Sequence, residues 1–130
     1  MEKCETDYFP DKLLFSEAGY EHDSLLIRME ADFHFHSSQG VVRVPKNFVS
    51  NGASIPRIFW NLLSPFGPYF KASICHDFGY SSLNDTFTRS QVDLYFLEGM
   101  KILGVGFFKR QTIYNAVKMF GWTCYKGYKA

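Results

Sequence analysis

The chain has 130 residues, 46% of them hydrophobic, and its 14 Phe and 8 Tyr residues predict a folded domain with an aromatic core. The net charge is only +1, which gives no electrostatic reason to expect a nucleic acid partner. Three cysteines without C-x-x-C spacing favour neither a disulfide framework nor a zinc site. The polar N-terminus and the lack of a long apolar run predict no transmembrane segment and a cytoplasmic location.

The first part of the chain, at about residues 10–50, is predicted to form β structure. Residues 24–30 are apolar-rich, and residues 31–36 alternate apolar with polar side chains, which is typical of a half-buried strand. The turn-forming residues 37–40 and the apolar residues 41–44 then predict a hairpin that ends at Pro45. We therefore expect an N-terminal antiparallel sheet.

The second part, at about residues 51–122, is predicted to be helical. A turn at residues 51–56 leads into a short helix through about residues 59–63. Further helices are predicted at about residues 68–81, from Thr88 onward, and at about residues 107–120, the last with Phe120 on its apolar face and Gly121 as its C-cap. These patterns predict an α+β fold in which the sheet packs on a three-helix region. At this length we expect a single domain over residues 1–130.

The helix that begins after Thr88 carries a buried carboxylate. Thr88 and Gln91 have the spacing of a capping box, which predicts the helix start. Asp93 shares a face with Phe96 and Met100, so its side chain points with the apolar residues. Because an unpaired buried charge is costly, Asp93 needs a partner, and the residues of the preceding helix supply candidates. We predict that the two helices are antiparallel neighbours.

The candidate partners belong to the segment Cys75–Tyr80, which brings an imidazole, a carboxylate and a phenol together. On a helix, His76 and Tyr80 share one face, whereas Asp77 points about 100° away from His76 and serves another task. A histidine can take a proton from water near neutral pH. We predict that His76 lies within hydrogen-bond reach of Asp93, and that Cys75 is a core residue rather than a nucleophile.

Several linked motifs resemble those of an uncharacterised family of small phage and prophage proteins, a domain of unknown function. The resemblance covers about residues 25–121. It implies a phage or prophage origin and a location in the host cytoplasm or in the virion, but no activity. The motifs that carry it are Val44-Pro45-x-x-Phe48, the run Asn51 to Arg57, Trp60, Pro65-x-Gly67, His76-Asp77-x-x-Tyr80 and Arg89-x-x-x-Asp93-x-x-Phe96.

A more distant resemblance covers about residues 51–97 and concerns the bacterial and fungal branch of phospholipase A2. The turn at Asn51-Gly52-x-Ser54 followed by the run His76 to Tyr80 is similar to the Asp-Gly-Cys-Ser turn and the His-Asp-Phe-Gly-Tyr helix of that branch. The resemblance implies that His76 is a general base oriented by Asp93. We predict Tyr80, on the same helix face as His76, as the third catalytic residue. The resemblance also implies a calcium site made by Asp77 and by the turn at Asn51 and Gly52. Asn51 stands where that branch has an aspartate, which weakens a calcium site.

Two functions remain open from the sequence. The chain is either a small hydrolase that acts on an ester or lipid-like substrate, or a non-enzymatic phage protein with a host or virion protein as its partner. In the second case, which includes assembly and counter-defence roles, the same polar residues form a structural core pair. An open pocket that reaches His76 favours the enzyme, and a sealed histidine favours the structural pair.

Overall fold

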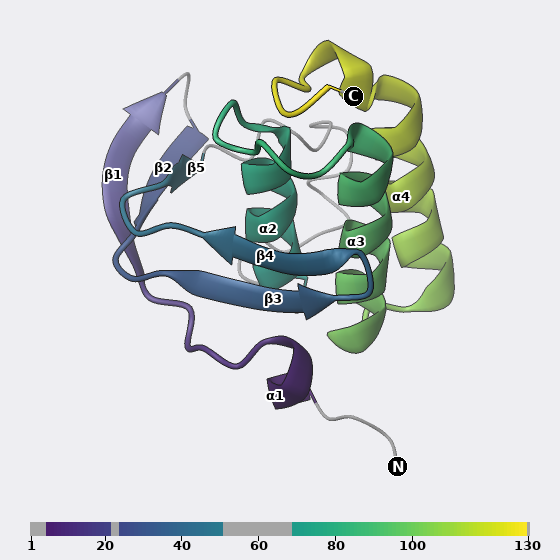
Figure 1. The fold of residues 1–130 in the computed structure, drawn as a ribbon, viewed down its shortest axis with the longest axis horizontal. Coiled ribbons are helices and arrows are strands. Elements are labelled where there is room, and N and C mark those ends of the chain that lie inside the picture. The colour runs from purple at the N-terminus through teal and green to yellow at the C-terminus, as the bar shows by residue number, and fades with distance from the viewer. Residues whose placement is uncertain (1–4, 22–23, 51–68, 130) are drawn as a thin grey trace. The chain divides into compact units, whose positions relative to one another are not determined.

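The computed structural model describes residues 5–21, 24–50 and 69–129, so the predicted short helix at about residues 59–63 lies outside the described residues. The chain folds as two compact units, residues 1–51 and residues 52–130. All the strands belong to the first unit and the three long helices belong to the second, so the predicted α+β class is confirmed (Figure 1). That residues 1–130 form a single domain stays a prediction.

The first unit contains two antiparallel sheets. One sheet has the strand order β1-β2-β5, made by Phe15–Glu21, Ser24–Met29 and Val49–Ser50. The other is the predicted hairpin, with β3 at Phe33–Ser37 and β4 at Gly40–Val44. The short helix α1 at Glu5–Tyr8 was not expected from the sequence, whereas strand β1 lies within the predicted β region, although its bounds were not predicted. Strand β1 has a register irregularity between Glu17 and Tyr20 and is largely exposed, so it lacks a clear apolar alternation.

The hairpin follows the alternation of its sequence. Phe33 and Phe35 on β3 and Val42 and Val44 on β4 are fully buried. The ring of Phe9 stacks on Phe35 with a centroid distance of 4.4 Å. Period-2 alternation therefore sets the buried face of this hairpin, and one register shift would expose all four side chains.

The second unit contains helices α2 at Phe70–Tyr80, α3 at Arg89–Ile102 and α4 at Phe107–Phe120, followed by a short 3-10 turn at Gly121–Thr123. The predicted capping box at the start of α3 is confirmed, since the Gln91 N–H donates to Thr88 Oγ1 and the Thr88 N–H donates to Gln91 Oε1. Gly121 is the C-cap of α4, as predicted. Phe120 was expected on the apolar face but is 54% exposed, because the small residue that packs inward at this helix end is Gly121, against Tyr80.

Helices α2 and α3 are antiparallel neighbours, as predicted. Near the end of α2, Gly79 lies against Val92 in the first turn of α3, and one turn earlier on α2 His76 packs against Phe96, further along α3. Contacts that run in opposite directions along the two helices define an antiparallel pair (Figure 1). Among the described residues, no helix has both the length and the apolar character needed to cross a membrane.

Candidate functional site

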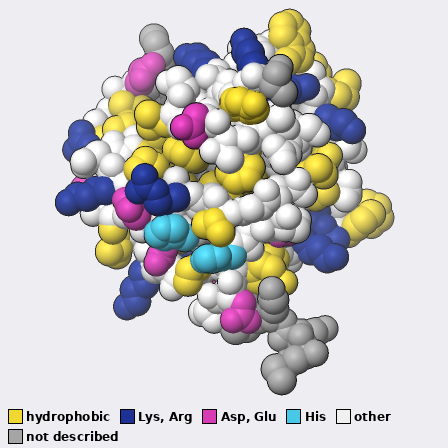
Figure 2. All heavy atoms as spheres, viewed as in Figure 1, with side chains coloured by type: hydrophobic (Ala, Val, Ile, Leu, Met, Phe, Trp, Pro, Cys, Tyr) yellow, Lys and Arg dark blue, Asp and Glu magenta, His cyan; other side chains and the backbone are white. Residues whose placement is uncertain are grey.

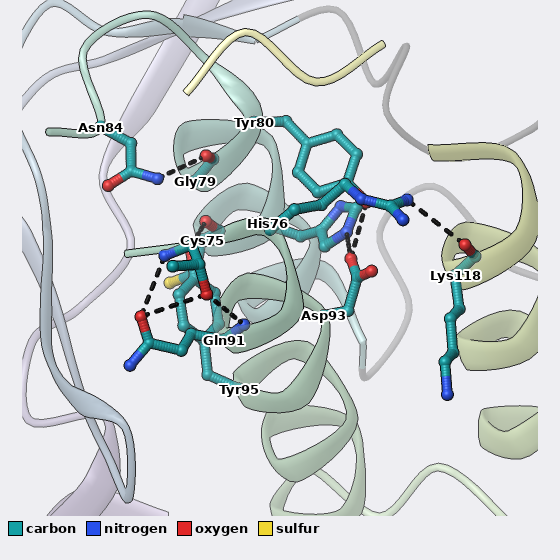
Figure 3. A network of polar contacts seen from close by, with 11 residues as sticks. Cys75, His76, Gly79, Tyr80, Asn84, Gln91, Asp93, Tyr95 and Lys118 are labelled. Atoms are coloured by element: carbon teal, nitrogen blue, oxygen red, sulfur yellow. Dashed lines mark hydrogen bonds and ion pairs between the residues drawn. The ribbon is translucent and has the colours of Figure 1, made fainter. Parts of the chain in front are cut away.

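The candidate site lies where the last turns of α2 face the first turns of α3. His76 and Tyr80 lie one helical turn apart on α2, and their rings are 4.3 Å apart between centroids. Both side chains point toward Asp93 on α3, as Figure 3 shows. The sequence spacing that placed these residues on one face is therefore reproduced in the fold.

Asp93 is the acceptor that joins the three residues. Its Oδ1 atom lies 3.0 Å from Nε2 of His76 and accepts a hydrogen bond of 2.7 Å from the Tyr80 hydroxyl (Figure 3). The Asp93 side chain is only 4% exposed. The predicted contact between His76 and Asp93 is confirmed, and the buried carboxylate has donors from two side chains.

The geometry assigns the roles of the two imidazole nitrogens. Because Nε2 faces a carboxylate oxygen, it is the nitrogen that carries the hydrogen of this bond. In a neutral ring, Nδ1 is then the nitrogen that can accept a proton. A His76 ring held in this way has the orientation that a general base requires.

The surroundings of the network are apolar and closed. The His76 ring packs on Phe96 at 4.5 Å between centroids, and no part of its side chain is exposed. Burial, and next the hydrogen bond to Asp93, raise the pKa of Tyr80 well above its ordinary value, while the guanidinium of Arg89 acts in the opposite direction. The Tyr80 hydroxyl is therefore a donor over the whole physiological pH range.

Further polar contacts hold the backbone around this network. The Tyr95 hydroxyl on α3 donates to the carbonyl of Cys75 at 2.6 Å, and the Asn84 side chain donates to the carbonyl of Gly79 at 2.8 Å (Figure 3). Cys75 is fully buried and burial raises the pKa of its thiol, so it is the core residue that we predicted.

Sequence reasoning did not identify Asn84 or the role of Arg89. Asn84 closes an Asx-type turn between the two helices, with its Oδ1 accepting from the backbone N–H groups of Thr86 and Phe87. An asparagine in a loop that precedes a capping box is a signal that could have found it. Arg89 was visible only as part of a motif, because its nearness to Tyr80 depends on how the helices pack.

The predicted calcium ligands are only partly described. Asp77 is half-buried on α2, and its charge adds to burial, the largest cause, in raising the pKa of Tyr69 and of Tyr95. The other two predicted ligands, Asn51 and Gly52, lie outside the described residues. Within the described part of the chain, no three His, Cys, Asp or Glu side chains gather as a metal site. Calcium therefore stays a prediction that rests on the turn at residues 51–54.

Comparison with known proteins defines the family. Residues 27–117 match a family described as "Protein of unknown function (DUF1353)", and the chain belongs to this family. It is also 35% identical over 103 residues to the uncharacterised protein y4jT of Sinorhizobium fredii (strain NBRC 101917 / NGR234). That alignment covers 75% of the chain and 30% of the relative. No solved structure matches the chain. The expected membership of an uncharacterised domain family is confirmed, and neither comparison carries an activity.

Proposed function

We propose that the chain is a small hydrolase of phage or prophage origin that acts on an ester or lipid-like substrate in the host cytoplasm or in association with the virion. The observation that carries this proposal is the 3.0 Å contact between Nε2 of His76 and Oδ1 of Asp93. With Nε2 turned to Asp93, a neutral His76 ring would offer Nδ1 as its proton acceptor.

In this proposal each residue of the network has its own task. His76 takes a proton from water at Nδ1 as the water oxygen attacks the ester carbonyl. It then returns the proton to the alkoxide oxygen, which leaves as an alcohol when the ester C–O bond breaks. Asp93 keeps the ring in one tautomer and stabilises the imidazolium that forms. Tyr80, the third predicted catalytic residue, donates its hydroxyl hydrogen to Asp93, and in this proposal it acts by positioning that carboxylate. Asp77, Asn51 and Gly52 are the proposed calcium ligands, and calcium at such a site would polarise the ester carbonyl.

The burial of His76 sets a condition on this mechanism. Its side chain is 0% exposed, so water and substrate reach Nδ1 only if neighbouring groups move. The same observation favours a second candidate, a non-enzymatic phage protein that binds a host or virion protein. In that case the pair of His76 and Asp93 is a structural polar core, and the protein acts in virion assembly or against a host defence.

Hydrolysis of ester and phospholipid substrates, assayed with added calcium and with chelator, tests the proposal. We expect His76→Ala and Asp93→Asn to lower the rate by about 10²–10⁴-fold, the usual loss for a general base. The matched control is His36→Ala on β3, an exposed histidine in the other unit, which should leave the rate unchanged. A melting curve for each variant separates loss of chemistry from loss of fold.

The two candidates give different patterns. The hydrolase requires turnover by the wild-type protein that disappears in folded variants. Absence of turnover under every condition, together with strongly lowered melting temperatures for His76→Ala and Asp93→Asn, supports the structural core instead, because breaking a buried hydrogen-bonded pair costs about 3–5 kcal/mol. If a chelator leaves a measurable rate unchanged, calcium is not needed for the reaction, and the proposal reduces to the pair of His76 and Asp93.

A further inference from the structure

The C-terminal part of the chain is basic, although the whole chain is almost neutral. Six of the 14 Lys and Arg residues follow Glu98, and none of the 13 Asp and Glu residues does. Figure 2 shows dark blue and yellow side chains gathered along the right-hand edge of the view, over α4 and the C-terminal turn. The net charge of +1 therefore hides a local positive potential that an anion would meet.

A pocket opens in this basic region. Its volume of about 330 Å³ lies at the lower end of the range typical for small-molecule sites, about 300–1,000 Å³. Two cationic side chains, three aromatic rings and one threonine line it, and the described lining includes no carboxylate: Thr88, Arg89, Trp122, Tyr125, Tyr128 and Lys129.

The walls of the pocket are held in place by the chain that forms them. The backbone N–H of Lys126 donates to the carbonyl of Tyr80 at 2.8 Å. The Tyr125 hydroxyl lies 2.9 Å from the carbonyl of Phe87 and 2.5 Å from that of Tyr128. A Cβ on Gly127 would lie 2.6 Å from the carbonyl oxygen of Gly79, so only glycine permits this close approach. The Tyr125 side of the pocket and the backbone beside it are consequently held in place, which lowers the entropic cost of binding there.

One of the two cationic side chains, that of Arg89, is also oriented. Nη1 of Arg89 donates to the carbonyl of Lys118 at 3.3 Å, which anchors a group that has five N–H donors. A planar guanidinium of this kind matches the oxygen atoms of a phosphate, and an ammonium adds a second positive charge. The indole of Trp122 is 69% exposed beside them, so a flat ring can stack on it without displacing protein atoms.

We propose that this pocket binds a small phosphorylated ligand with a flat ring, of the nucleotide class. The phosphate lies between Arg89 and Lys129, and the ring packs on Trp122. This inference does not rest on the proposed hydrolase, because the lining residues exclude His76 and Asp93. A free nucleotide and the phosphorylated end of a nucleic acid strand share this chemistry.

Calorimetric titration of the full chain with adenosine monophosphate and with inorganic phosphate tests the proposal. We expect Arg89→Gln and Lys129→Gln each to weaken nucleotide binding by about tenfold or more, which corresponds to the loss of one charge-assisted contact. Trp122→Ala should weaken binding of the nucleotide but leave binding of inorganic phosphate unchanged. Lys109→Gln and Phe108→Ala are the matched controls, since both residues are exposed on α4 and neither lines the pocket.

Two further titrations separate the sources of the ligand. A short single strand of DNA with a terminal phosphate should bind more tightly than the mononucleotide if a strand end is the ligand, and equally or less tightly if it is a free nucleotide. Either result supports the proposed pocket only if Arg89→Gln and Trp122→Ala weaken the binding that is measured. The proposal is overturned if nucleotide binding is absent at millimolar concentration, or if the pocket variants and Lys109→Gln bind alike. Saturation by anionic phospholipid vesicles without any binding of nucleotide also overturns it, and assigns the basic region to a membrane surface.

Discussion

The hydroxyl of Tyr95 on α3 lies so close to Gly79 of α2 that a Cβ atom on that residue would clash with it. Such a Cβ would also lie 2.5 Å from a methyl carbon of Val92. Because no side chain separates the helices here, Tyr95 can donate to the carbonyl of Cys75 and Tyr80 can reach Asp93. The missing side chain of Gly79 is therefore a condition for the polar network, one turn away from His76.

Gly79→Ala is expected to destabilise the protein in spite of the better helix propensity of alanine. Propensity favours alanine by about 1 kcal/mol, whereas forcing an extra carbon into a close-packed helix contact costs about 1–3 kcal/mol. We expect a net loss of about 1 kcal/mol or more in the free energy of unfolding, measured by denaturant titration. Ser90→Ala is the control, because Ser90 is exposed on α3 and its change fills no helix contact. Equal stability for the two variants would show that the helices can separate without cost.

Thr88→Ala is expected to lower the free energy of unfolding by about 1 kcal/mol, the usual worth of an N-cap side chain. The variant removes the Oγ1 atom that accepts from the N–H of Gln91 and leaves that N–H without its cap. The neighbouring exposed residue gives a control, Ser90→Ala, which should stay within about 0.5 kcal/mol of wild type. A Thr88→Ala protein as stable as Ser90→Ala would mean that water replaces the cap.

Tyr80→Phe tests the positioning role of the phenol. The change removes the donor to Oδ1 of Asp93 and leaves the contact of His76 with that oxygen. We expect a loss of about 0.5–1.5 kcal/mol in stability, the range for one hydrogen bond. If the chain is a hydrolase, the rate should fall less than in His76→Ala, because Tyr80 acts only through Asp93. A rate loss as large as that of His76→Ala would place the hydroxyl at the reacting atoms and contradict this role.

The elements that were predicted from sequence are those with local signals. Alternation at residues 33–36 defined the hairpin, and the capping box at Thr88 defined the start of α3. The facing of His76 and Asp93 could also be inferred, because each needs a buried partner and both lie on apolar helix faces. These inferences use spacings of a few residues, which the sequence displays directly.

Features that depend on distant contacts were not predicted. Strand β1 lies in the predicted β region, but its bounds were not predicted, because it has no clean alternation and is ordered by pairing with β2. The pocket around Arg89 exists because the C-terminal segment folds back onto the end of α2. There the N–H of Lys126 donates to the carbonyl of Tyr80, 46 positions earlier in the sequence. The net charge concealed the basic region, because a sum over the chain discards position.

One buried thiol and two buried phenols make the stability of the fold sensitive to alkaline pH. Cys75 and Tyr95 are fully buried and Tyr80 is 3% exposed. Burial is the largest cause that raises the pKa of each group, and for Tyr80 the hydrogen bond to Asp93 adds to it. In the unfolded chain these groups ionise at their ordinary values, about 8.5 for a thiol and about 10 for a phenol.

At alkaline pH the folded protein therefore keeps protons that the unfolded chain releases. The contribution of these groups to the free energy of unfolding is complete below the pKa values of the unfolded chain. It is lost as the pH rises from those values toward the higher pKa values of the folded state. Each group contributes a slope of about 1.4 kcal/mol per pH unit. We expect a melting temperature that is steady near pH 7 and falls steeply above about pH 10. Tyr95→Phe should reduce the slope, whereas Tyr20→Phe, at a phenol that is 70% exposed, should not. Identical slopes in these two variants would mean that the buried phenols do not control alkaline unfolding.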